Sequence, residues 1–175
     1  MQNALIDLRG KRGLILGIAN DRSIAWGCAR VMAACGAEVA VTYLDDGAEP
    51  YVRPLAESLQ CPLVLPCDVR APGQLEAVFD AVRNHWGSLD FVIHSIAWAP
   101  KEDLQGRVVD CSADGFAQAM DISCHSFIRC AKLAEPLMPH GGCLLTVTFY
   151  GGEKVVPHYN LMGPVKAALQ ASVRA

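Results

Sequence analysis

The sequence lacks any long apolar run. None of its apolar stretches approaches the roughly 18 residues needed to span a bilayer. Residues 1–13, MQNALIDLRGKRG, carry acidic and basic side chains where a secretory signal peptide has its apolar region. We therefore expect no membrane partner, and we expect a cytoplasmic protein whose thiols stay reduced.

The sequence also lacks a C-x-x-C pair, although it has 8 cysteines. These cysteines are dispersed through apolar segments, which is typical of small buried side chains rather than of a disulfide framework. His94, His125 and His158 show no ligand-like spacing. We therefore predict no metal site.

Charge is sparse, and there is no basic run. Charged residues make up 19% of the chain against 52% hydrophobic residues, which indicates a globular protein. The net charge is -3, and the basic residues are scattered, so the sequence excludes the electrostatic footprint of a nucleic-acid-binding protein. Internal repeats, low-complexity tracts and linkers are missing too, and we predict one domain over residues 1–175.

Short apolar runs alternate with segments of helical periodicity along the chain. The runs predict strands at 13–18, 37–44, 62–65, 89–95 and 143–149. The periodic segments predict helices at 23–35, 49–59, 73–86 and 113–138, and a last helix that begins near Pro157 or Tyr159. This alternation predicts an α/β fold, a doubly wound, Rossmann-like parallel sheet with strand order 3-2-1-4-5.

The predicted sheet is smaller than a full dinucleotide-binding sheet, which has about six strands or more. The sequence supplies five strands and ends inside a predicted helix. We therefore expect a single incomplete dinucleotide-binding domain that lacks the last strands of the fold.

Two predicted helices show a defined apolar face. In the helix at 73–86 the inward residues are Leu75, Val78, Phe79 and Val82. In the helix at 23–35, Ser23 is a predicted N-cap, and the residues that recur at helical spacing are Ile24, Cys28, Val31 and Met32.

The loop after the first predicted strand suits an anion. Gly17 allows the backbone to approach a pyrophosphate, and Ser23 with the amide of Ile24 stands at a helix N-terminus, where unpaired N–H groups favour negative charge. The loop does not follow the common G-x-G-x-x-G pattern, and a glycine-containing turn between strand and helix is frequently only structural.

The ends of the other strands favour a dinucleotide. Asp68 suits the amino group of an adenine, although it could equally form a turn or cap a helix, and the small residues around Ser95 leave room for a ribose. Leu44 ends the second strand, where a carboxylate often holds the ribose 2'-hydroxyl. Asp45 and Asp46 would repel a 2'-phosphate, so we predict NADH rather than NADPH.

Tyr159 and Lys166 stand seven residues apart on the predicted last helix, which places both on one helix face. A cation close to a phenol lowers the pKa of the phenol, and a phenol of this kind is a useful proton donor. The plainer alternative is an aromatic residue at the edge of the core and a solvated charge.

Taken together, these segments resemble one family. GIANDRSIAWG, CDV, HSIAWAPKEDLQGRVVD, DISCHSF and VVPHYNLMG occur in its order and spacing, from about Leu8 to the end of the chain. The sequence resembles the NADH-dependent enoyl-acyl-carrier-protein reductases of bacterial type II fatty acid synthesis, a divergent branch of the short-chain dehydrogenase/reductases. Commoner members of that superfamily carry the lysine four residues after the tyrosine, where this chain has Gly163.

The resemblance implies an oxidoreductase that transfers hydride from NADH to the trans-2 double bond of an acyl-carrier-protein thioester. Tyr159 would protonate the enolate, and Lys166 would hold the nicotinamide ribose. Homotetramers are implied as well, although we expect them less for a shortened chain. The expected cofactor residues are Gly17, Ser23, Ile24, Leu44, Asp68, Val69, Ser95, Ile96 and Lys166, and the expected substrate contacts are Ala99 and Met162.

Two residues depart from the family pattern. Phe149 replaces a tyrosine that could donate a hydrogen bond, and Pro164 interrupts the predicted helix between Tyr159 and Lys166. With the missing strands, these departures leave an alternative function open, a non-catalytic NAD-binding fragment or a catalytically silent relative.

Overall fold

The computed structural model describes residues 6–175, which form two compact units. The sheet unit comprises the residues up to Ser95 together with Ala131–Leu145, and the helical unit comprises Ile96–Cys130 and Thr146–Ala175. The expectation of one domain over residues 1–175 stays a prediction.

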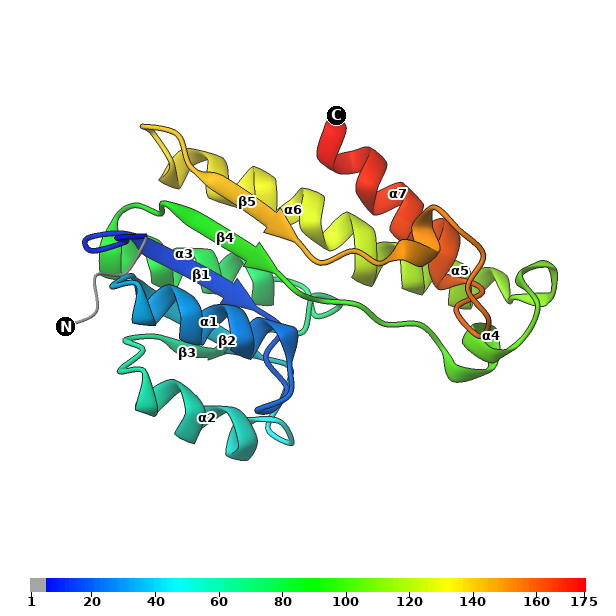
Figure 1. Cartoon of the computed structure of the whole chain (residues 1–175), viewed down its shortest axis with the longest axis horizontal. Coiled ribbons are helices and arrows are strands. Elements are labelled where there is room, and N and C mark those ends of the chain that lie inside the picture. The colour runs from blue at the N-terminus through cyan, green and yellow to red at the C-terminus, as the bar shows by residue number, and fades with distance from the viewer. Residues whose placement is uncertain (1–5) are drawn as a thin grey trace. The chain divides into compact units, whose positions relative to one another are not determined.

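The sheet has five strands in the order β3-β2-β1-β4-β5 (Figure 1), which confirms the predicted order. The strands are β1 Arg12–Leu16, β2 Glu38–Tyr43, β3 Val64–Pro66, β4 Phe91–His94 and β5 Cys143–Thr146. Strand β1 pairs in parallel with β2 and with β4, and β2 pairs in parallel with β3. The central strands are buried, as their continuous apolar runs predict.

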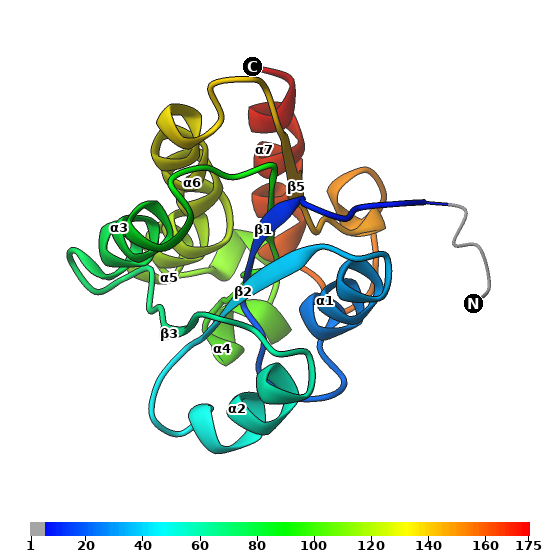
Figure 2. The same ribbon diagram turned by 90° about the vertical axis from the view of Figure 1, so that its left-hand side faces the viewer.

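Helices cover both faces of the sheet. They are α1 Ile24–Ala34, α2 Glu49–Ser58 and α3 Gln74–Trp86. Figure 2 shows α1 and α2 on one side of the strands β1, β2 and β3, and α3 on the other, as a doubly wound fold requires. The predicted inward face of α3 is confirmed, because all four of its residues are buried: Leu75, Val78, Phe79 and Val82.

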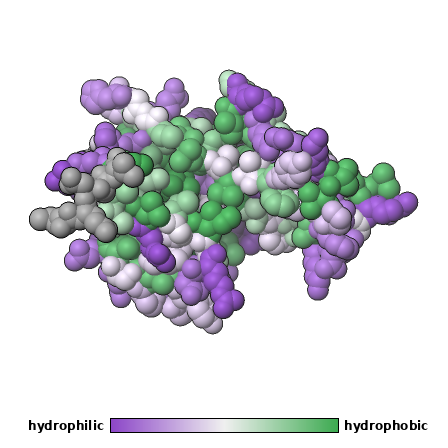
Figure 3. Space-filling model, in the orientation of Figure 1, coloured by the Kyte–Doolittle hydropathy of each residue, from purple (hydrophilic) through white to green (hydrophobic). Residues whose placement is uncertain are grey.

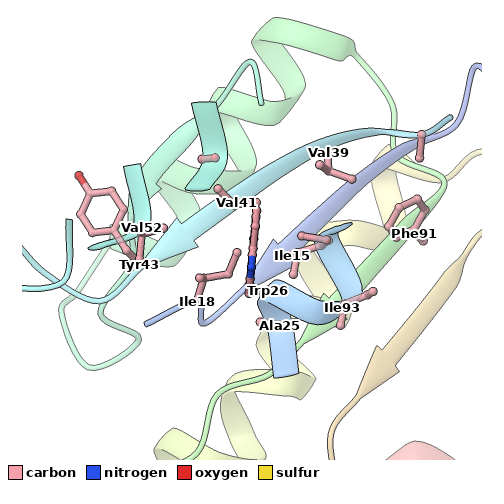
Figure 4. Packing of buried hydrophobic residues seen from close by; sticks show 13 residues of the cluster. Ile15, Ile18, Ala25, Trp26, Val39, Val41, Tyr43, Val52, Phe91 and Ile93 are labelled. Atoms are coloured by element: carbon pink, nitrogen blue, oxygen red, sulfur yellow. The ribbon is translucent and has the colours of Figure 1, made fainter. Parts of the chain in front are cut away.

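The predicted inward face of α1 is partly wrong. Ile24 and Val31 are 62% and 60% exposed. The residues that α1 buries are Ala25, Trp26 and Ala29, because the alanines allow the helix to approach the sheet closely while the indole fills the space beside them. Figure 4 shows Trp26 among the side chains of the strands, in the core cluster that includes Ile18 and Val41.

The long helix predicted at 113–138 is four consecutive helical pieces of different geometry. They are α5 Ala113–Met120, a π-helical turn Asp121–His125, α6 Ser126–Ala134 and a 3-10 turn Glu135–Leu137. The polar loop before them contains α4 Lys101–Gln105 and a 3-10 turn Val108–Asp110, and another 3-10 turn spans Tyr150–Gly152.

The last helix, α7, spans Met162–Arg174, so the predicted start near Pro157 or Tyr159 is wrong. The residues before it form turns, with positive φ angles of 62° at His158 and 29° at Asn160. These angles lie outside the right-handed helical region, and the helix can begin only after them.

The eight cysteines are free thiols, and three of them are buried: Cys67, Cys124 and Cys130. The expectation that most are buried is therefore too strong. Apolar residues also reach the surface, and Figure 3 shows green patches between the purple hydrophilic side chains of the face in view. In residues 6–175 no helix has the length and apolar character that a membrane crossing requires.

Gly13 provides a test of the sheet packing. A Cβ at this position would lie 2.0 Å from the ring of Phe91, its partner on β4. We expect Gly13→Ala to destabilise the protein by about 1–3 kcal/mol, because a packed ring has to move. Urea unfolding measures the change.

Gly27→Ala is the matched control. Gly27 lies inside α1, and a Cβ there meets nothing within 4 Å. This substitution is expected to stabilise the protein by roughly 0.5–1 kcal/mol, because alanine loses less backbone entropy in a helix. Equal effects of both substitutions would contradict the packing described for Gly13.

Candidate functional site

The candidate cofactor residues of the sheet unit follow the carboxyl ends of neighbouring strands. Gly17 follows β1 with a φ of 94°, which disfavours any residue with a Cβ, and its amide donates to Thr42 Oγ1 at 3.2 Å. The amide of Ser95, which follows β4, donates to the carbonyl of Leu16 at 3.1 Å. Gly17 and Ser95 therefore lie at the switch in strand order, where doubly wound sheets bind ligands.

Ser23 occupies the N-cap position of α1, but its side chain does not cap the helix. Its hydroxyl instead accepts the amides of Ala19 and Asn20, both at 3.0 Å, and so holds the loop that follows Gly17. The first-turn amides of α1 receive no bond from this side chain. These amides fit the anionic pyrophosphate of a dinucleotide. Ile24 is the first residue of α1, so its amide is one of them, and its side chain points to solvent.

Asp68 forms a turn, the alternative that the sequence left open. Its Oδ1 accepts the amide of Arg70 at 2.9 Å, and the Arg70 guanidinium bonds both carboxylate oxygens, at 3.0 Å from Nε to Oδ1 and 2.8 Å from Nη2 to Oδ2. The hydrogen bonds from Arg70 lower the pKa of Asp68, so this residue is an acceptor at neutral pH. Val69 is buried, and its contact with a cofactor stays a prediction.

Arg70 is a cation that the sequence interpretation missed. The negative charge of Asp45 contributes to raising the pKa of Arg70, after the larger effect of Asp68, so Arg70 lies close to the end of β2 as well. Leu44, at the same strand end, is half exposed and offers no hydrogen bond from its side chain. Asp45 and Asp68 both act on Arg70, so two acids meet one arginine at this place.

In the helical unit, Tyr159 precedes α7, so the prediction that it shares a helix face with Lys166 is wrong. Its ring packs against Phe149, with ring centroids 4.7 Å apart and planes inclined by 58°. On Gly151 a Cβ would lie 2.3 Å from the Tyr159 ring, so only glycine allows this close approach. Phe149 and Gly151 together orient the phenol.

The turn that carries Tyr159 is strained and anchored. Its neighbours His158 and Asn160 both have positive φ, a conformation that costs free energy in residues with a Cβ. The side-chain amide of Asn160 donates to the carbonyl of Leu104 in α4 at 2.9 Å, which supports the strained backbone.

Burial raises the pKa of Tyr159 above the ordinary value of a tyrosine. The lowering that a lysine on the same helix face would cause is therefore not found. The phenol is neutral at pH 7, so it keeps the proton that a general acid has to supply.

Lys166 is buried in α7, with 4% of its surface exposed, so the alternative of a solvated charge is wrong. Its Nζ donates to the carbonyl of Val147 at 2.7 Å. Burial lowers the pKa of Lys166, and the neighbouring Cys124 opposes this shift. An ammonium has three N–H donors, so Lys166 can serve Val147 and a ligand at the same time.

A cavity of about 410 Å³ lies beside the phenol. Its lining includes Tyr159, Gly151 and Asn160, but neither Met162 nor Ala99, the two predicted substrate contacts. Met162 is buried in the first turn of α7, and Ala99 and Ile96 are partly exposed in the segment after β4. Contact of Met162, Ala99 or Ile96 with a ligand stays a prediction.

The sequence model of the enoyl-(acyl carrier protein) reductase family matches residues 17–175. The chain belongs to this family. The NADH-dependent enoyl-acyl-carrier-protein reductase 1 of Rhizobium meliloti is 50% identical over 167 residues, which cover 95% of this chain and 61% of that enzyme. The resemblance seen in the sequence is therefore confirmed.

Solved reductases of this family share the fold. The enoyl-acyl-carrier-protein reductase of Anaplasma phagocytophilum, determined in complex with NAD, is 52% identical with a TM-score of 0.93, covering 96% of this chain and 64% of that one. The Bacillus cereus reductase, determined with NADP+ and indole naphthyridinone, is 45% identical with a TM-score of 0.93, covering 97% of this chain and 66% of that one. The chain thus spans less than two thirds of the length of these relatives.

Sequence reasoning missed three residues of the candidate site: Arg70, Gly151 and Asn160. Gly151 and Asn160 carried a local signal, because glycine allows close approach and asparagine tolerates positive φ more readily than most residues. Arg70 carried a local signal as well, because its partner Asp68 lies only two residues before it.

The contact between Gly151 and Tyr159 can be tested by a double-mutant cycle. We expect Gly151→Ala to destabilise the protein by about 1–3 kcal/mol, because the added Cβ overlaps the ring. In a Tyr159→Ala background the same substitution should cost much less, because the ring is gone. Urea unfolding of the four proteins gives the coupling, and an equal cost in both backgrounds would exclude the contact.

Proposed function

We propose that this chain supplies the cofactor-binding and catalytic residues of an NADH-dependent enoyl-acyl-carrier-protein reductase in fatty acid elongation. The observation that carries the proposal is Lys166, a buried ammonium held on one backbone carbonyl and seven residues after Tyr159. A buried cation is costly unless it is paired, and a site that builds negative charge on an oxygen gives such a cation a use.

The sheet unit holds the proposed NADH residues. The amide end of α1, with Gly17 before it, suits the pyrophosphate, and the ionised Asp68 suits the adenine amino group. Ser95 and Ile96 would line the nicotinamide end, while Leu44 and Val69 offer an apolar wall and a backbone contact. Reduced nicotinamide, when bound, supplies a hydride for the β carbon of the enoyl thioester.

Tyr159 and Lys166 divide the remaining chemistry between them. The neutral phenol of Tyr159 donates a hydrogen bond to the thioester oxygen and then a proton to the enolate. Lys166 would hold the ribose hydroxyls of the cofactor, while Val147 fixes the position of its Nζ. Ring contact with Phe149 keeps the phenol oriented, although Phe149 itself donates no hydrogen bond.

The substrate would be a trans-2-enoyl thioester of acyl carrier protein, with Ala99 and Met162 beside the acyl chain. We further propose a cytoplasmic enzyme that has neither a nucleic-acid nor a membrane partner, and we expect homotetramers for the family rather than for this shortened chain. The net charge of -3 and the scattered basic residues support the absence of a nucleic-acid partner.

The proposal is tested with two proteins. One is this chain, and the other is a chimaera in which the chain replaces the matched residues of the Rhizobium meliloti reductase. We expect the chimaera to oxidise NADH when a crotonyl thioester is added, measured by loss of nicotinamide absorbance. NADH binding without any oxidation by the chimaera would instead indicate a non-catalytic or silent relative.

Substitutions at the two catalytic residues should differ in their effects. In the chimaera, Tyr159→Phe should lower kcat by about 100-fold or more, because the general acid is lost, while the Kd of NADH changes little. Lys166→Ala should lower kcat and weaken NADH binding as well. Equal losses of NADH affinity in both variants would contradict the separate roles.

The acidic residues after β2 predict a preference between cofactors. We expect NADH to bind this chain more tightly than NADPH, because Asp45 and Asp68 act on Arg70 and Asp46 follows Asp45 in the chain, so negative charge exceeds positive charge. Asp45→Asn and Asp46→Asn should reduce the difference between the affinities for NADH and NADPH, and added salt should reduce this difference too. Fluorescence titration with both nucleotides measures it, and tighter binding of NADPH would contradict the prediction.

A further inference from the structure

The segment after β4 leaves the sheet without forming another strand or helix until Lys101. Backbone amides and carbonyls in such a segment need partners from elsewhere. The amide and the carbonyl of Trp98 both form hydrogen bonds with the same side chain. Ser123 Oγ accepts the Trp98 amide at 2.8 Å and donates to the Trp98 carbonyl at 3.0 Å.

Ser123 is suited to this task by its burial and its place in the helical unit. It is fully buried in the π-helical turn, between Ile122 and Cys124, which are buried as well. In an α-helix the side chains of three consecutive residues point in widely different directions around the helix axis. A π-helical turn has more residues per turn, so consecutive side chains point in more similar directions. The Ser123 hydroxyl donates its proton to Trp98 and also accepts a hydrogen bond from Trp98, so the orientation of the hydroxyl is fixed.

We infer that Ser123 is a positioning residue, which holds the segment Ile96–Ala99 through the backbone of Trp98. The inference rests on the proposed function, in which Ile96 lines the cofactor and Ala99 touches the acyl chain. Ser123 touches neither ligand. It acts by fixing the peptide groups between these two residues, as a neighbouring strand would fix them in a sheet.

The first experiment uses the tryptophans of this chain and needs no activity. Trp98 is 41% exposed, whereas Trp26 and Trp86 are 6% and 9% exposed, so acrylamide quenching reports mainly on Trp98. Ser123→Ala should steepen the quenching slope and shift the emission to longer wavelength, because the released segment exposes the indole further.

Ser126→Ala is the matched control. Ser126 is equally buried, lies three residues away, and its hydroxyl donates to the carbonyl of Ile122 rather than to Trp98. This variant loses a buried hydroxyl of the same size, but its quenching slope should match that of the unchanged chain. Equal slopes for Ser123→Ala and the unchanged chain would overturn the inference.

The second experiment measures the consequence for the reaction in the chimaera. Ser123→Ala should lower kcat/KM for the crotonyl thioester by about tenfold, whereas Ser123→Thr, which keeps the hydroxyl, should restore most of the loss. An unchanged kcat/KM in Ser123→Ala, or an equal loss in Ser126→Ala, would overturn the positioning role. An inactive unsubstituted chimaera would refute the proposed function instead, and the quenching result would still decide whether Ser123 holds Trp98.

Discussion

The helical unit depends on one constraint, which is that a buried ammonium needs a hydrogen-bond acceptor. Lys166 meets it by donating to the carbonyl of Val147, just after β5. Gln170, one turn further along α7, donates to Thr148 Oγ1 at 3.0 Å, so the helix is tied to this loop at two successive residues. The position of α7 fixes where the chain has to turn before the helix begins, and that turn carries Tyr159.

The departures from the family pattern fit this arrangement. Because α7 begins at Met162, Pro164 is its third residue, and the amide that proline lacks would have no partner inside the helix. Phe149 replaces a possible hydrogen bond with a ring contact to Tyr159. Neither residue therefore disrupts the turn that carries Tyr159 or the helix that carries Lys166.

The parts of the fold that could be predicted are those that follow from the periodicity of apolar side chains. The strand order and the inward face of α3 followed from apolar patterns that burial enforces. The start of α7 was not predictable from apolar periodicity, because that periodicity contains no sign of the positive φ angles at His158 and Asn160 or of the bond from Asn160 to the distant Leu104. The same holds for Ser123, whose partner Trp98 lies 25 residues away. For the site, residue types could be predicted, but their hydrogen bonds could not.

We propose that Tyr159 and Lys166 serve hydride transfer to an enoyl thioester, and the fate of the hydride tests this role. The chimaera is supplied with crotonyl thioester and with NADH that carries two deuterium atoms at C4, and the product is examined by mass spectrometry and NMR. We expect a saturated thioester with one deuterium on the β carbon, formed much more slowly by Tyr159→Phe. A saturated product without deuterium, or with deuterium on the α carbon, would contradict it.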